Sequence, residues 1–255
     1  MRILIANDDG IYSPGIAALV DVACRFGDVR VVAPDVEQSS AGHAITASRP
    51  VRYRPTRIFE GVEAYRVNGT PADCVALGAY HWERVDVVLS GVNLGPNLGN
   101  ATWHSGTLAA AKQAALLGLR GIALSAPVRD EEADFSTLEP WIERVLAMLL
   151  DESCPRLVNV NFPHAPRGIR WTAQAVDQYD GKVVPSEDPM GRTNYWFTVV
   201  PLERYGENTD LWAVEHGYVS MTPLRLDLTD YEELARVDRT SVPDSPTTAG
   251  SRAVT

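Results

Sequence analysis

The sequence predicts an α/β protein built on a Rossmann-like, doubly wound and mainly parallel sheet. Short apolar runs, typical of strands covered on both faces, alternate along the chain with longer segments of helical periodicity. Such alternation gives strand, helix and strand units whose strands lie parallel in one sheet. The apolar runs also end abruptly in polar turns, at the position where open α/β sheets bind their ligands.

The first unit joins a strand to a pair of carboxylates. Ile3–Ala6 is a continuous apolar run that stops at Asn7. Neighbouring residues on a strand point to opposite faces, so Asp8 and Asp9 can approach one point only where the chain leaves the strand. Gly10 permits such a turn. We therefore expect an acidic turn at the carboxyl end of the first strand.

A helix and a second strand follow this turn. The apolar periodicity of Ile16–Phe26 predicts a helix that ends at Gly27. Val29–Ala33 is the second apolar run, and Pro34 ends it. The loop 35–46 is rich in small polar residues, so we expect it to form no element of its own and to be able to close over the first loop.

The next segment combines weaker strand signals with a clear helix start. Val51–Tyr65 alternates loosely between Pro and Gly residues and is interpreted as edge strands. Thr70 is a suitable N-cap and Pro71 a suitable first helical residue. Together they predict a helix over Ala72–Trp82.

The third apolar run, Val85–Leu89, leads into a long polar loop, 90–106. The glycines at 91, 95 and 99 are spaced by four, which matches neither the dinucleotide fingerprint nor the phosphate loop, so a dinucleotide-dependent oxidoreductase is disfavoured. The alanine-rich segment that follows predicts a helix with Ser105 or Thr107 at or just inside its N-terminus. Free backbone N–H groups there would suit a phosphate.

The remaining core elements continue the alternation. Gly121–Ser125 is a candidate strand, Leu138–Leu150 an amphipathic helix, and Leu157–Val160 a strand that ends at Asn161. These segments complete an α/β core, which we place at residues 1–165.

The sequence changes in character beyond the core. In residues 166–239 aromatic and β-branched residues occur in short runs between Pro and Gly, and long helical periodicity is lost. We interpret this part as a β-rich extension that serves as an oligomerisation arm and returns to the core. Residues 240–255 are rich in Ser, Thr, Pro, Gly and Ala and are expected to form a flexible tail.

Composition limits the class of protein. A chain of 255 residues with 45% hydrophobic residues can bury a full core. The 23 Lys and Arg against 33 Asp and Glu give a net charge of −10, which argues against binding to a nucleic-acid polymer. No apolar run approaches the roughly 18 residues of a membrane span, so we expect a soluble, cytoplasmic protein. Cys24, Cys74 and Cys154 are odd in number and far apart, which predicts buried, reduced thiols.

Oxygen ligands follow three of the predicted strands. Asp8 and Asp9 follow the first, Ser39 the second and Asn93 the third. The carboxyl ends of parallel strands can meet at one edge of a sheet, and an all-oxygen set suits Mg²⁺, Mn²⁺ or Ca²⁺ rather than zinc. Four such ligands leave positions for water and a phosphate oxygen, as metal-assisted hydrolysis requires. Either aspartate could accept the proton of the water, and a covalent aspartyl-phosphate is the chemical alternative.

Seven motifs occur in order along nearly the whole chain. They are NDDG at Asn7–Gly10, SPG at Ser13–Gly15, APD…QS at Ala33–Ser39, GTPADCV at Gly69–Val75, SGVNLGPNLG at Ser90–Gly99, SGT-AA at Ser105–Ala110 and TPLRLDLT at Thr222–Thr229. In this number and order they resemble the SurE (survival protein E) family of metal-dependent 5′/3′-nucleotidases, also described as acid phosphatases.

The resemblance implies a set of site residues. One divalent cation per subunit, Mg²⁺ or Mn²⁺, is expected on Asp8, Asp9, Ser39 and Asn93. The residues expected to carry catalysis are Asp8, Asp9, Asn97 and Ser105. Those implied to line the phosphate site are Asn97, Ser105, Gly106 and Thr107. His104 and His43, the histidines near the proposed site loops, are further candidates on the substrate side, together with Gly42. Two positions depart from the family pattern: Ser40 competes with Ser39 as a ligand, and His104 stands where Tyr is common.

The sequence thus predicts a divalent-metal-dependent phosphomonoester hydrolase acting on nucleoside monophosphates. Nucleoside 5′-phosphates are the expected substrates, with 3′-nucleotides and short polyphosphate as further candidates. The resemblance also implies a homodimer or homotetramer formed through the extension. The alternative is a regulatory module that binds metal and nucleotide without turnover, and release of phosphate separates the two.

Overall fold

A computed structural model of the chain describes residues 1–127, 135–176, 181–199 and 206–238. The chain divides into two compact units, Met1–Leu224 and Arg225–Thr255. The strands are β1 Arg2–Ala6, β2 Asp28–Pro34, β3 Tyr53–Thr56, β4 Glu63–Val67, β5 Val87–Leu94, β6 Arg120–Ala126, β7 Leu157–Asn161, β8 Gly168–Trp171, β9 Gly181–Glu187, β10 Thr193–Val199 and β11 Tyr218–Pro223. The helices are α1 Pro14–Ala23, α2 Pro71–His81, the 3₁₀ helix η1 Gly99–Trp103, α3 Gly106–Leu116, α4 Glu139–Leu149, α5 Asp210–Glu215 and α6 Tyr231–Asp238.

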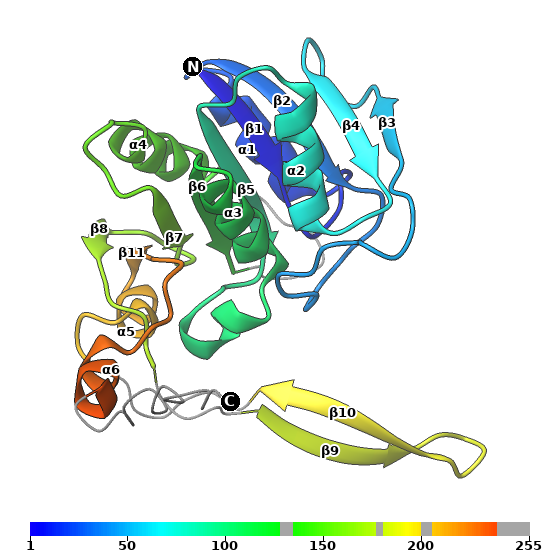
Figure 1. The fold of residues 1–255 in the computed structure, drawn as a ribbon, viewed down its shortest axis with the longest axis vertical. Helices are drawn as coiled ribbons and strands as arrows, with labels where there is room; N and C mark the ends of the chain where they lie inside the picture. Colours follow the sequence, from blue (N-terminus) through cyan, green and yellow to red (C-terminus); the bar gives the residue numbers. More distant parts are fainter. Residues whose placement is uncertain (128–134, 177–180, 200–205, 239–255) are drawn as a thin grey trace, which may run out of the picture. The chain divides into compact units, whose positions relative to one another are not determined.

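The first unit is organised around a nine-stranded sheet in the order β3-β4-β2-β1-β5-β6-β7-β11-β8 (Figure 1). From β4 to β7 neighbouring strands are parallel. β3 and β11 add antiparallel pairs with β4 and β7. The α/β fold class and the mainly parallel sheet are therefore confirmed. Ile5 of β1 lies opposite Val31 of β2 and Leu89 of β5, so the carboxyl ends of these three strands are neighbours.

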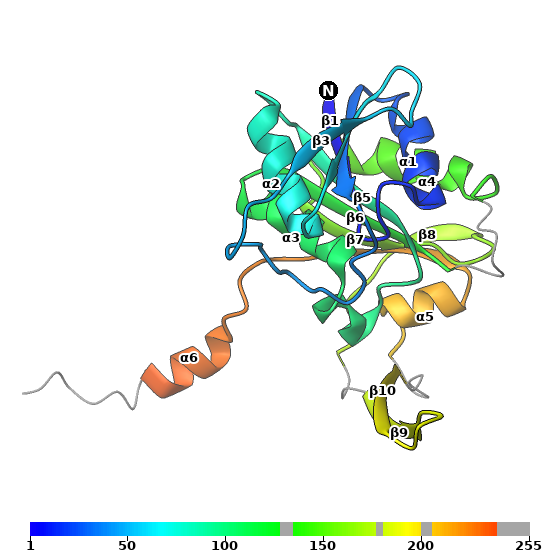
Figure 2. The same ribbon diagram turned by 90° about the vertical axis from the view of Figure 1, so that its right-hand side faces the viewer.

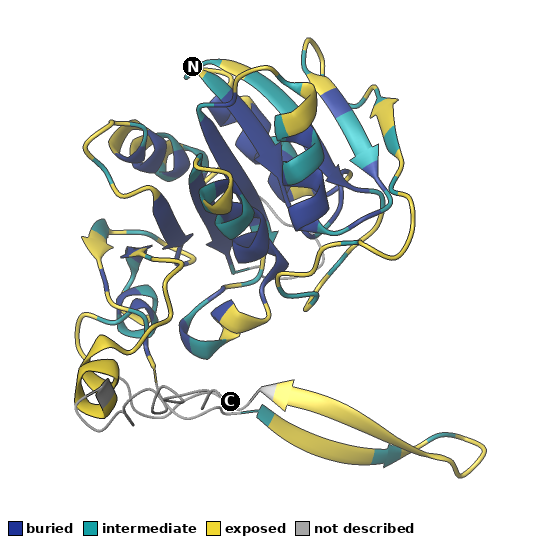
Figure 3. Cartoon of the chain, in the orientation of Figure 1, coloured by how far each residue is buried: buried dark blue, intermediate teal, exposed yellow. Residues whose placement is uncertain are grey.

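Helices cover both faces of this sheet, with α1 and α4 on one side and α2 and α3 on the other (Figure 2). The alternation of side chains along β1 matches the two layers. Ile3 and Ile5 pack in the core cluster that contains residues of α1 and α4, whereas Leu4 and Ala6 pack with α2 and α3. All four are completely buried, and Figure 3 shows the central strands of the sheet coloured as buried. Each buried Ile or Leu contributes about 1.5–3 kcal/mol, which explains why β1 is apolar on both faces.

Two predicted boundaries differ from the structure near the N-terminus. α1 includes Pro14 in its first turn, capped by Ser13, and ends at Ala23 rather than continuing to Gly27. Gly27 serves a different purpose, because a Cβ there would lie 2.1 Å from the carbonyl oxygen of Met1. Of the predicted edge strands, only β3 lies at the edge, since β4 pairs with both β2 and β3.

The third predicted strand is longer than its apolar run. β5 continues through the start of the predicted polar loop to Leu94. Its register against β6 shifts between Ser90 and Asn93. Asn93 therefore projects from an irregular strand end, a more fixed position than a loop would give it.

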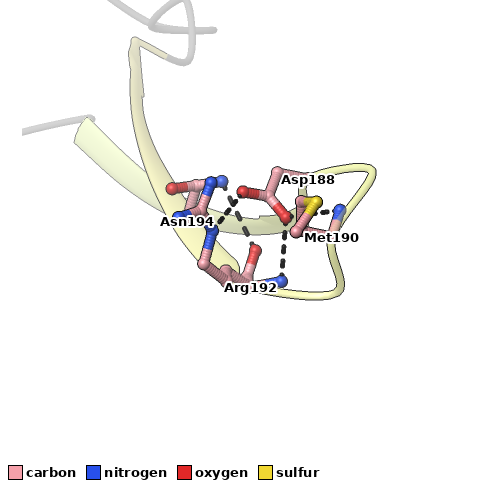
Figure 4. A network of polar contacts seen from close by, with 4 residues as sticks. All are labelled: Asp188, Met190, Arg192 and Asn194. Carbon is pink, nitrogen blue, oxygen red and sulfur yellow. Dashed lines mark hydrogen bonds and ion pairs between the residues drawn. The ribbon is translucent and has the colours of Figure 1, made fainter.

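The region predicted as a β-rich extension, 166–239, contributes to two sheets. β8 and β11 join the nine-stranded sheet, and β9 and β10 form a separate antiparallel hairpin. At the hairpin turn, Asp188 accepts hydrogen bonds from the backbone N–H groups of Met190 at 2.8 Å and Arg192 at 3.0 Å, and Arg192 Nε donates to it at 2.7 Å (Figure 4). The amide of Asn194 donates to the Arg192 carbonyl at 3.4 Å. These hydrogen bonds to Asp188 hold its pKa below the usual value.

Other differences are local. Two helices, α5 and α6, lie in the region that was predicted to be β-rich. They span six and eight residues, which is too short to show the apolar periodicity by which longer helices are predicted. The predicted tail, 240–255, lies outside the described residues. Cys24 caps the end of α1 and is exposed, contrary to the expected burial, whereas Cys74 is buried. Among the described residues, no helix is both long and apolar enough to cross a membrane.

Candidate active site

The segments that follow β1 and β2 and the end of β5 meet at one edge of the sheet. They border a cleft of about 1650 Å³, more than the roughly 300–1,000 Å³ of typical small-molecule pockets. Because β2, β1 and β5 are adjacent and parallel, their carboxyl ends bring together residues that are distant in sequence. The predicted site residues that line the cleft are Asp8, Asp9, Ser39, Asn93, Asn97, His104 and Ser105.

Asp8 is held against the N-terminus of α3. It is 5% exposed, and its Oδ1 accepts a hydrogen bond from the Thr107 hydroxyl at 2.6 Å. Burial raises the pKa of Asp8, while hydrogen bonds from Thr107 and from the backbone of Gly106 oppose that rise. A Cβ on Gly106 would lie 2.7 Å from the Asp8 Cβ, so a glycine is needed for this approach. The positive end of the helix dipole also favours a carboxylate here.

Asp9 is half-buried beside Asp8 and is less firmly held. Its Oδ2 accepts a hydrogen bond from the Leu94 backbone N–H at 3.0 Å. Burial raises the pKa of Asp9 to about 6; the Leu94 hydrogen bond opposes this rise, and the charges of Asp8 and Glu37 add to it. No salt bridge to either aspartate occurs among the described residues. The pair is therefore a negative centre that is hydrogen-bonded but has no cationic side chain paired with it among the described residues.

Neutral oxygens stand near this centre. The Asn93 amide nitrogen donates to the Gly95 carbonyl at 2.7 Å. This bond uses the nitrogen of the Asn93 amide and leaves its oxygen as a possible ligand for a cation. The Ser39 hydroxyl donates to Glu37 at 2.5 Å and so keeps its oxygen lone pairs available. Ser40, with a left-handed backbone φ of 58°, lines the same cleft. Both serines therefore stay candidates as ligands.

Asn97 is fixed by a buried polar network. Its amide nitrogen donates to the hydroxyls of Ser125 at 2.9 Å and Thr107 at 3.4 Å. Its backbone N–H donates to Asn161 Oδ1 at 2.7 Å, and its carbonyl accepts from Asn159 at 2.8 Å and from Asn161 at 3.1 Å. The amide nitrogen is thus engaged within the protein. From the sequence, Asn161 is recognisable only as the end of a strand, and the support that Ser125, Asn159 and Asn161 on β6 and β7 give to Asn97 is not predicted.

The start of α3 differs from the predicted phosphate cradle. The backbone N–H of Leu108 bonds the Ser105 hydroxyl at 3.0 Å, and that of Ala109 bonds the Ser105 carbonyl. Gly106 and Thr107 are directed to Asp8 and do not line the cleft. The first N–H groups of the helix therefore stabilise Asp8 and the cap. The Ser105 oxygen accepts from Leu108 through one lone pair, so its hydroxyl hydrogen and its second lone pair are available to the cleft.

The two histidines predicted near the site, His43 and His104, occupy different environments in the structure. His104 lines the cleft, and its carbonyl accepts a hydrogen bond from the backbone N–H of Gly42 at 3.1 Å. Gly42 and His43 do not line the cleft. The Nε2 atom of His43 instead lies 2.9 Å from the side-chain oxygen of Gln113 on α3. The structure therefore brings His104 to the site but not His43.

Several cleft residues come from regions that the sequence analysis did not connect with the site. They include an aromatic stretch of β10 and apolar residues of α5, namely Tyr195, Trp196, Phe197, Leu211 and Val214. Their separation in sequence from the acidic turn, and the assignment of their segment to an arm, explain why they were missed.

The donor set determines which ions the site could hold. The described residues contain no group of three or more His, Cys, Asp or Glu side chains that could bind a metal ion. A cation here would depend on the two aspartates together with the neutral oxygens of Asn93 and a serine. Such a set suits hard divalent cations.

The chain is similar to known proteins over most of its length. The family model described as Survival protein SurE matches residues 3–181. The protein named 5′-nucleotidase SurE 1 from Thermus thermophilus is 47% identical over 90% of this chain and 93% of its own length. The 5′-nucleotidase SurE from Deinococcus radiodurans is 46% identical over 89% and 88%. The crystal structure of the SurE protein from Aquifex aeolicus superposes with a TM-score of 0.80 at 38% identity, covering 94% of this chain and 99% of that one.

Proposed function

The chain belongs to the SurE family, and we propose that it is a phosphomonoesterase that releases phosphate from nucleoside 5′-monophosphates. The two sequence relatives described above carry the name 5′-nucleotidase. The observation that carries the proposal is the convergence of Asp8, Asp9 and Asn93 in one cleft with the hydroxyl of Ser105. Carboxylates that can hold a cation and a hydroxyl that can donate to a phosphate oxygen suit metal-assisted hydrolysis of a phosphate ester.

A divalent cation fits the residues of this site. Burial raises the pKa values of Asp8 and Asp9, so a nearby positive charge would offset the electrostatic cost of keeping both ionised. We propose that Asp8, Asp9, Asn93 and Ser39 hold this cation, with Ser40 as the alternative serine, and that it is Mg²⁺ or Mn²⁺. When bound, the cation supplies positive charge to the phosphoryl oxygens and makes a water molecule more acidic.

The side chains of the cleft have different proposed roles in the reaction. Asp8 is almost fully buried and engaged by Thr107 and α3, which suits a fixed ligand. Asp9 is more exposed to the cleft and is the better placed of the two to accept the proton of the attacking water. The Ser105 hydroxyl is free to donate to a phosphate oxygen, and His104 lies beside it to contact substrate. A contact from Asn97 requires its amide to leave Ser125 and Thr107.

The size of the cleft supports a broader substrate range. A nucleoside 3′-phosphate, which is a phosphomonoester, and short polyphosphate, which is a phosphoanhydride, both present a terminal phosphoryl group, and about 1650 Å³ leaves room for either. We include both as candidate substrates, with the 5′-phosphates first.

The hairpin supports the proposal that the chain forms a homodimer or homotetramer through residues 166–239. Tyr195, Trp196 and Phe197 are 64%, 64% and 82% exposed. Clustered exposed aromatic residues are characteristic of protein interfaces. Within the proposed organisation, residues 1–165 form the catalytic core and the extension connects subunits.

Phosphate release across a panel of substrates tests the proposed function. The metal-free protein is supplied with Mg²⁺ or Mn²⁺ and with nucleoside 5′-phosphates, 3′-phosphates or polyphosphate. We expect release from the 5′-phosphates that depends on the cation and stops on chelation. Failure to turn over any phosphoester while the protein binds the cation would instead support a non-catalytic regulatory module.

A further inference from the structure

Asp210 is a completely buried carboxylate that the proposed reaction does not use. It is 0% exposed and occupies the first turn of α5, after the N-cap Thr209. It does not line the cleft. A buried charge of this kind costs free energy unless hydrogen bonds compensate it, so its partners indicate its purpose.

The partners of Asp210 come from three separate segments. Its Oδ2 accepts a hydrogen bond from the backbone N–H of Gly99 at 2.8 Å. Its Oδ1 accepts from the backbone N–H groups of Ala175 at 2.9 Å and Leu211 at 2.8 Å. One carboxylate therefore joins η1 to α5 and to the segment that follows β8.

The Gly99 end of this junction lies within the site. Gly99 begins η1, between the cleft residues Asn97 and Ser105. Its carbonyl accepts hydrogen bonds from the Thr102 hydroxyl at 2.8 Å and from the Gln174 amide at 2.9 Å. Its φ of +51° and the 3.0 Å from its would-be Cβ to the Ala175 carbonyl oxygen require a glycine. The turn is thus held at Gly99 through both the backbone N–H and the backbone carbonyl of that residue.

We propose that Asp210 is a positioning residue for the phosphomonoesterase reaction, holding η1 through Gly99 so that Asn97 and Ser105 stay in register with the aspartate pair. The inference rests on the proposed function. The carboxylate is specific for this task because both of its oxygens accept, whereas an amide would place an NH₂ group against one of the N–H donors. A displacement of about 1 Å at a catalytic group costs on the order of 100-fold in rate, so loosening this turn should be visible in kcat.

The test compares Asp210→Asn with Thr209→Ala. The first keeps the size of the side chain and removes one acceptor. The second removes the cap of the same helix, where the Thr209 hydroxyl accepts from Trp212 N–H at 3.3 Å, and does not touch Gly99. Each variant is assayed below its unfolding temperature for kcat and KM with a nucleoside 5′-monophosphate, for Mn²⁺ affinity, and for hydrogen exchange of the 98–104 backbone.

We expect Asp210→Asn to lower kcat by at least about tenfold, to leave Mn²⁺ affinity unchanged and to speed exchange in 98–104. Thr209→Ala should keep the wild-type kcat and speed exchange only in α5. An equal fall in kcat for both variants, or wild-type exchange of the turn in Asp210→Asn, would overturn the proposal. If Asp210→Asn does not fold, the wild-type protein still tests the contact, because the Gly99 N–H bonded to Asp210 should exchange slowly. Exchange of that N–H as fast as in an unstructured peptide would also overturn the proposal.

Failure of the proposed function has a different signature. Wild-type protein that releases no phosphate contradicts the phosphomonoesterase assignment, and the kcat comparison then has no baseline. The exchange of 98–104 still decides whether Asp210 holds the turn, because it requires no turnover.

Discussion

Replacing Asp9 by Asn should make the metal-free protein more stable at neutral pH. In the folded protein the pKa of Asp9 is raised from 3.8 to about 6, chiefly by burial. The folded state therefore binds more protons than the unfolded state between these two values. The contribution of Asp9 to stability is fully present below pH 3.8 and is lost as pH rises through about 6.

The size of the effect follows from the same pKa. A rise from 3.8 to about 6 corresponds to about 3 kcal/mol at 1.36 kcal/mol per pKa unit. Because Asp9 is partly open to solvent, screening reduces the expected effect to roughly 1–2 kcal/mol. The Asn side chain can still accept from the Leu94 N–H, so this hydrogen bond is retained. Above pH 6, Asp9→Asn should thus be more stable than wild type by that amount.

Urea denaturation in the presence of a chelator, from pH 5 to pH 8, measures this difference. The gap between Asp9→Asn and wild type should widen as pH rises to about 6 and then stay constant. Saturating Mn²⁺ should reverse the order, because a ligand of the folded state stabilises the protein that binds it. Parallel pH curves for the two proteins, or equal stabilisation of both by Mn²⁺, would refute the reasoning.

Two further predictions concern the same site. Gly106→Ala places a Cβ 2.7 Å from the Asp8 Cβ and 2.8 Å from its Oδ2, so it should displace this carboxylate. We expect the free energy of unfolding, measured by urea denaturation, to fall by about 1–3 kcal/mol. Turnover, measured by phosphate release, should fall at least tenfold. Wild-type turnover in Gly106→Ala would show that the position of Asp8 is not critical. If Ser39 is the ligand, Ser39→Ala should weaken Mn²⁺ binding measured by calorimetry and Ser40→Ala should not; the reverse order would assign Ser40.

The sequence was most informative where structure is local. The buried strand Ile3–Ala6 and the capped helix after Thr70 follow from apolar runs and cap chemistry that need no distant partner. The meeting of Ser39 and Asn93 with the acidic turn was predictable in outline, because parallel strands share an edge for their carboxyl ends. In the structure β2, β1 and β5 are adjacent, which is the strand arrangement that this outline requires.

The rest depended on contacts between distant residues. Ser125, Asn159 and Asn161 support Asn97 only because β6 and β7 lie beside β5, and nothing in their local sequence indicates that. Asp210 resembles an ordinary residue of a helix start until the fold brings Gly99 to it. The extension of β5 depends on a register shift against β6, which no apolar pattern reveals.

Release of phosphate should require a divalent cation held by Asp8 and Asp9. The most direct measurement is Mn²⁺ binding by calorimetry alongside phosphate release from a nucleoside 5′-monophosphate over the same Mn²⁺ concentrations. We predict one cation per subunit, the same half-saturation for binding and turnover, and loss of both in folded Asp9→Ala. Turnover that persists in chelator, or that survives in Asp9→Ala, would contradict the account.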